Sequence, residues 1–112
     1  DGVQLRLDRD AEARTPLISS AIRAADVRAS RRATFDELRA EYGGDGPDLL
    51  AADHASHRPG PSSHSPCMHR DDAATRSHSL VEVTPRSVRF SYTPSAPCRR
   101  DDGLAVEIAR AP

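Results

Sequence analysis

Apolar and polar residues alternate along the stretch SHSLVEVTPRSVRFSYT, with a break near its middle. This period of two predicts a β-hairpin whose first arm is residues 77–83 and whose turn is residues 84–86. In the second arm, Val88, Phe90 and Tyr92 alternate with polar residues, and we expect these three side chains to point inward.

Two shorter stretches show the same alternation. Residues 3–7, VQLRL, predict a half-buried strand. Residues 104–110, LAVEIAR, predict a final short strand in preference to a helical stub. By contrast, residues 55–66 are rich in Ser, His, Pro and Gly, which is typical of an irregular surface loop.

The first half of the chain has apolar residues at helical spacing and two helix start signals. Thr15 is placed to cap a helix whose first residue is Pro16. Thr34 and Glu37 form the second signal, a capping box in which each side chain satisfies a backbone N–H. These signals leave open whether residues 16–42 are one bent helix or two.

The helical region is expected to stop at Gly43. Pro47 then begins a short helical turn that ends near His54. The predicted order is therefore helices first and antiparallel strands afterwards, with residues 1–54 mainly helical and residues 67–112 forming strands. This segregation along the chain predicts an α+β fold in a single partial domain.

The side chains that build hydrophobic cores are scarce. Leu, Ile, Val and Phe together make 19 of 112 residues, or 17%, and disordered chains typically lie below about 20%. The high net charge that accompanies disorder is missing, because the balance is only −1. We therefore expect the hydrophobic surface to be completed by further sequence or by a second chain.

All 16 basic residues are arginine, and 17 acidic residues balance them. No basic stripe with interleaved aromatic residues is present, so binding to nucleic acid is not expected. Nor is a membrane partner expected, because no stretch approaches the roughly 20 apolar residues of a membrane span. The abundance of Arg, Ala, Asp and Pro without Lys or Asn is typical of GC-rich bacterial coding, and we expect a bacterial, cytoplasmic protein.

The stretch SSHSPCMHR places Cys67 between His64 and His69. A thiol beside an imidazole is the arrangement of a cysteine nucleophile and its base, which makes Cys67 and His69 candidate catalytic residues. The spacing suits equally a small half-buried Cys beside a polar His on a strand. His54, which follows Asp53, is a further catalytic candidate, although the last turn of a helix is a natural place for a histidine.

The same residues offer an alternative, a metal site. On a strand, Cys67 and His69 would point to the same face, and Cys98 with one further histidine would complete the four ligands of a zinc site. No C-x-x-C or H-x-x-x-H pair supports this reading. From the residues alone we therefore expect no metal and no other cofactor, and we keep this ligand set as the alternative. The two cysteines could also form a single disulfide.

The order of these segments is more specific than any one of them. An Arg-rich helix, SRRATFDELRAEYGG, leads to LLAADH; SPCMH follows the loop, and then come the strand SLVEV, a turn, a second strand and a Pro-Cys pair. Over residues 28–100 this order resembles the C-terminal part of the isopenicillin N acyltransferase-like (penicillin acyltransferase) family of N-terminal-nucleophile cysteine hydrolases. The sharpest matches are Ser-x-Cys-x-His at residues 65–69 and Pro97-Cys98. The chain departs from the family in having Ser95-Ala96 before that proline, in place of a Gly-Pro-Pro ending.

The resemblance implies an αββα sandwich, made as a precursor that cuts itself to expose an N-terminal Cys. That Cys attacks an amide or a thioester, for example a coenzyme A thioester, and passes the acyl group to an amine or to water. The chain begins with Asp1 and contains no Asn, so the family's nucleophile and oxyanion Asn have no counterpart in it. We therefore expect a C-terminal segment or subunit, in which Cys67 and His69 lie near the chemistry but outside it.

The partners implied are the N-terminal portion or second chain of the same enzyme, in a heterodimer, with a small-molecule acyl donor and an amine acceptor. Such enzymes often act in bacterial secondary metabolism. There are two alternative functions: a small metal-binding module built on Cys67, His69, Cys98 and one further His, and a non-catalytic interaction chain that retains the fold.

Overall fold

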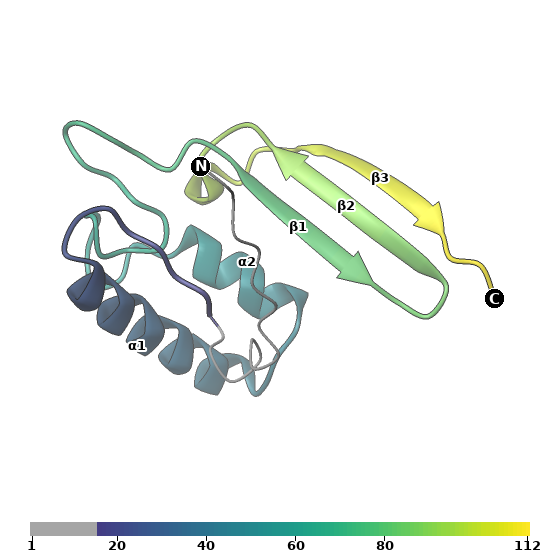
Figure 1. Ribbon diagram of the computed structural model, residues 1–112, viewed down its shortest axis with the longest axis horizontal. Coiled ribbons are helices and arrows are strands. Elements are labelled where there is room, and N and C mark those ends of the chain that lie inside the picture. Colours follow the sequence, from purple (N-terminus) through teal and green to yellow (C-terminus); the bar gives the residue numbers. More distant parts are fainter. Residues whose placement is uncertain (1–15) are drawn as a thin grey trace, which may run out of the picture.

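The structure is a computed structural model, and it describes residues 16–112. The elements are α1 (Ala24–Tyr42), α2 (Pro47–Ala55), β1 (His78–Val83), β2 (Ser87–Thr93), the short 3₁₀ helix η2 (Pro97–Arg99) and β3 (Leu104–Ala109). Figure 1 shows the two helices together on one side of the molecule and the sheet extending away from them. The predicted α+β class, with helices first and antiparallel strands afterwards, is confirmed. The strand expected at residues 3–7 lies outside the described residues.

Helix α1 does not begin at Pro16, so that prediction is wrong. The hydroxyl of Ser20 accepts a hydrogen bond from the Ile22 N–H at 3.3 Å and donates one to the Ile22 carbonyl at 2.7 Å, which folds the backbone into a local turn. Arg23 then adopts a left-handed conformation with φ 47°, and the helix starts after it. The capping-box signal does not start a helix either, because Thr34 is buried inside α1. The region therefore contains one helix.

The end of α1 matches the prediction. Gly43 adopts a left-handed conformation with φ 73° and donates its N–H to the Ala40 carbonyl, while the Gly44 N–H bonds to the Arg39 carbonyl. These two bonds form a Schellman cap, for which a residue without a Cβ is preferred. Pro47 begins α2 as expected, because its missing N–H has no partner to lose at the first helical position.

The two helices meet over a small hydrophobic core. Phe35 and Leu38 of α1 contact Leu49 of α2, and Ala52 packs against them. The three larger side chains are each 5% exposed or less. Within residues 16–112 this cluster draws only on the helices, so it does not attach the helices to the sheet.

Strand β2 lies between β1 and β3 and is antiparallel to both, which confirms the predicted hairpin and the final strand. The hairpin closes at the pair Val83–Val88. Its turn is stabilised by Thr84, whose N–H donates to the Ser87 carbonyl at 2.9 Å and whose hydroxyl accepts from the Ser87 N–H at 2.9 Å. The loop expected at residues 55–66 is likewise irregular beyond the end of α2.

The register places most of the large apolar side chains on one face of the sheet. This apolar sheet face consists of Val81, Val83, Val88, Phe90, Tyr92, Leu104, Val106 and Ile108. Helix α2 lies toward the opposite face, where Leu80 and Thr93 share a cavity with it. The prediction that Val88, Phe90 and Tyr92 point inward is therefore wrong, since all three lie on this face and Phe90 and Tyr92 are 45% and 39% exposed.

Candidate metal centre

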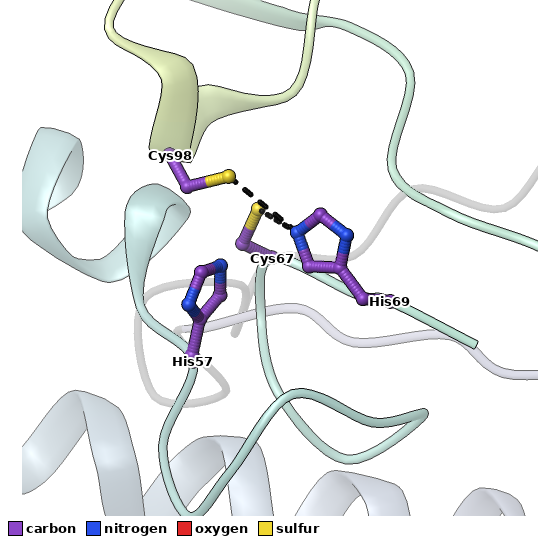
Figure 2. Close-up of side chains that lie close together, drawn as sticks. All are labelled: His57, Cys67, His69 and Cys98. Atoms are coloured by element: carbon purple, nitrogen blue, oxygen red, sulfur yellow. Dashed lines mark hydrogen bonds between the residues drawn. The ribbon is translucent and has the colours of Figure 1, made fainter.

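Four side chains that can bind a metal converge from three segments far apart in the sequence. His57 follows α2, Cys67 and His69 lie in the loop before β1, and Cys98 lies in η2. One ligand atom from each side chain lies within 4.8 Å of the others, and Figure 2 shows the side chains directed toward a common centre. Nε2 of His69 lies 3.5 Å from Sγ of Cys67 and 3.4 Å from Sγ of Cys98.

The loop that carries Cys67 is stabilised by hydrogen bonds to backbone groups within residues 56–75. The Cys67 N–H donates to the Ser56 carbonyl at 3.0 Å, and the buried hydroxyl of Ser65 donates to the Cys67 carbonyl at 2.7 Å. Met68 and Thr75 are joined by two bonds of 2.9 Å. Apart from one isolated β-bridge the segment consists of bends. The expectation that Cys67 lies on a strand is therefore wrong, because its backbone N–H bonds to the Ser56 carbonyl in an irregular segment and not to a neighbouring strand.

Cys67 is buried, the other three residues of the cluster are half-buried, and no disulfide joins the two cysteines. Cys67 has no exposed surface. Burial raises the pKa of its thiol; the backbone N–H of Cys98 donates a hydrogen bond that acts in the opposite sense, and the Cys98 side chain adds to the increase. The rings of His57 and His69 meet edge to face, with centroids 4.9 Å apart and an interplanar angle of 84°.

Cys67, His69 and Cys98 are thus brought together as the metal alternative requires, and His57 is the fourth member. The spacing H-x9-C-x-H has no fixed structural meaning, and His57 lies in an irregular segment, so the sequence did not distinguish it from the other histidines. His64, which is closer to Cys67 in the sequence, instead has its Nδ1 3.3 Å from the hydroxyl of the preceding serine.

The geometry does not favour Cys67 as a nucleophile. Reactive cysteines lie in partly exposed, electropositive surroundings that lower the thiol pKa. Cys67 has no exposed surface, and burial shifts its pKa in the opposite direction. The imidazole of His69 is at hydrogen-bond distance, but Cys67 presents no surface to a substrate carbonyl.

His54, the other catalytic candidate, lies apart from this cluster. It lines a cavity of about 490 Å³ between α2 and the sheet, where its ring meets that of His78 edge to face with centroids 6.3 Å apart. Burial, and secondly the charge of His78, lower the pKa of His54. The neighbouring Asp53 interacts electrostatically with Arg31; burial raises the pKa of Asp53 to about 6, and Arg31 opposes this shift.

Comparison with protein families, with curated proteins and with solved structures finds no match to this chain. In the part of the chain from residue 16 onward, neither helix has the length and apolar character needed to cross a membrane.

Proposed function

We propose that this chain is the C-terminal segment or subunit of a cysteine N-terminal-nucleophile acyltransferase or amide hydrolase. The observation that carries the proposal is the apolar sheet face, which the described residues leave in contact with water. Seven of its eight side chains are between 39% and 77% exposed. Large exposed apolar patches mark protein–protein or membrane interaction sites or ligand-binding grooves, and we take this one as a protein–protein surface.

A second sheet is the cover that best fits such a face. Two sheets pack face to face about 10 Å apart when the inner face of each is apolar. With α2 toward the opposite face of this sheet, an added sheet would produce the order helix, sheet, sheet. That order is three of the four layers of the αββα sandwich implied by the family resemblance. The partner in this proposal is the N-terminal portion or second chain of the same enzyme.

The nucleophile of the proposed enzyme is an N-terminal Cys supplied by that partner after self-cleavage. Its α-amino group accepts the thiol proton, and the sulfur attacks the carbonyl carbon of an amide or of a thioester such as an acyl-coenzyme A. The leaving amine or thiol takes up the proton, and an amine or water then releases the acyl group from the sulfur. Buried Cys67 has no part in these steps; this chain contributes a layer of the fold and the cavity beside His54.

The test is intact mass and N-terminal sequencing of everything that co-purifies with this chain when its complete gene is expressed. We expect a second polypeptide that begins with Cys, and transfer of an acyl group from a coenzyme A thioester or a chromogenic amide. The matched control replaces that N-terminal Cys with Ala, which should abolish acyl transfer. A gene product that consists of the 112 residues alone and carries no acyl group after incubation with the donor would rule the proposal out.

A further inference from the structure

We propose that His57, Cys67, His69 and Cys98 bind one Zn²⁺ ion in a closed tetrahedral site that attaches the helices to the sheet. This inference does not depend on the acyl-transfer proposal, because it rests on other residues and other distances.

The spacing of the ligand atoms fits the dimensions of zinc coordination. With Zn–S bonds of about 2.3 Å and Zn–N bonds of about 2.0–2.1 Å at tetrahedral angles, a sulfur and a nitrogen bound to the same ion lie about 3.6 Å apart. The two separations from Nε2 of His69 to the cysteine sulfurs are 3.5 and 3.4 Å. Because all four ligand atoms lie within 4.8 Å of one another, small side-chain movements suffice to surround an ion.

An unpartnered nitrogen gives independent support. Nε2 of His57 is buried and makes no hydrogen bond to the described residues. A buried polar atom without a partner costs free energy, and native structures rarely retain one without a reason. A metal ion at the centre of the cluster would accept the lone pair of a ring nitrogen of His57, as it would accept that of His69.

The charges also balance around a dication. Zinc binds thiolates, so each thiol gives up its proton to solvent as its Zn–S bond forms, and binding one ion to both cysteines at neutral pH releases two protons. The two negative charges then offset the charge of the ion inside the buried site.

The ligand set selects the metal. Two thiolates and two imidazoles in a tetrahedral arrangement suit Zn²⁺, whereas Mg²⁺ and Ca²⁺ require oxygen ligands. Since protein side chains fill all four positions, no position is left for water or substrate, and such closed sites are structural.

The structural role follows from where the ligands lie. The cluster of Phe35, Leu38 and Leu49 joins only the two helices. The zinc site would bind the segment that leaves α2, through His57, to η2 at the end of β2, through Cys98. One ion would therefore link the helices to the part of the chain that follows β2, two parts of the fold that this cluster does not join.

Zinc content and X-ray absorption of the reduced protein, purified with the polypeptides that accompany it, test the proposal. After loading with zinc sulfate and desalting, we expect one zinc per chain and a first shell of two sulfurs and two nitrogens. His57→Ala should remove one nitrogen from that shell and weaken binding at least tenfold, whereas His64→Gln, a change to a histidine of the same loop, should alter neither. The wild-type spectrum needs no variant to fold, so it decides the ligand set by itself.

Cys67→Ser supplies a second measurement. It should lower zinc affinity more than about 100-fold and, on zinc addition, release one proton fewer than the wild type. A shell dominated by oxygen, zinc binding that is unchanged in both variants, or reduced wild-type protein that retains no zinc after desalting would each overturn the proposal. A Cys67–Cys98 disulfide that persists under reducing conditions would overturn it as well.

Discussion

Replacing Val106 with glutamate should distinguish the stability of the chain itself from its attachment to a covering sheet. Val106 is 60% exposed and lies on edge strand β3, within the apolar sheet face. In the chain alone the new carboxylate stays in water, so the free energy of unfolding should change by no more than about 1 kcal/mol. Ala105 is also exposed and lies on the opposite face of the same strand, which makes Ala105→Glu the matched control.

The expected loss is much larger when a second sheet covers the face. Burial of the exposed 60% of Val106 is worth about 1 kcal/mol, because full burial of such a side chain contributes about 1.5–3 kcal/mol. A glutamate at this position forfeits that gain, and it must also bury a carboxyl group without a partner, at a cost of about 2 kcal/mol or more. The total of about 3 kcal/mol corresponds to association weakened on the order of 100-fold. Ala105→Glu should weaken association by less than about fivefold, because it corresponds to under 1 kcal/mol.

The assay is the dissociation constant between this chain and the partner proposed above, determined for the wild type and both variants at equal zinc loading. Circular dichroism of each isolated variant shows whether it retains the secondary structure of the wild type. Equal effects of the two substitutions on association would refute the reasoning, since they would show that the apolar sheet face is not the covered one. A loss of structure in isolated Val106→Glu alone would refute it too, because the side chain would then already be buried in the chain itself.

Two further predictions concern the helices, both measured by denaturant unfolding of the zinc-loaded protein. Leu49→Ala removes a side chain that is 2% exposed from the core between the helices and should lower the free energy of unfolding by about 2–5 kcal/mol. Leu50→Ala, at a position 37% exposed, should lower it by less than about 1 kcal/mol. Equal losses would contradict the assigned core. Because burial raises the pKa of Asp53 from 3.8 to about 6, the folded state holds the proton more tightly, so this carboxyl lowers stability progressively as the pH rises through that window. Asp53→Asn should therefore leave stability unchanged below about pH 4 and stabilise the protein above pH 6 by about 1–2 kcal/mol. This is less than the full linkage value because the carboxyl is partly exposed. A stabilisation that does not vary with pH, or an equal effect of Asp36→Asn at an exposed position, would contradict this prediction.

Local signals in the sequence predicted most of the secondary structure. The alternation of residues 77–93 predicted the hairpin, Gly43 predicted the end of α1, and Pro47 predicted the start of α2, because each depends on a few neighbouring residues. The failure at Pro16 has the same origin. Thr15 and Pro16 are suited to a helix start, but the turn at Ser20 and the left-handed conformation of Arg23 interrupt the helix before residue 24.

The sequence by itself determined the α+β order, the end of α1, helix α2, the hairpin, the final strand and the two unlike faces of the sheet. Only the tertiary structure decided which face is covered and which loop residues meet. The alternation of residues along a strand separates the two faces of the sheet but does not predict which face the helices approach. Here the apolar face is exposed to solvent. His57 joins Cys67, His69 and Cys98 because an irregular loop and η2 meet in space. No short-range sequence pattern predicts this contact, since it depends on the path of the whole chain.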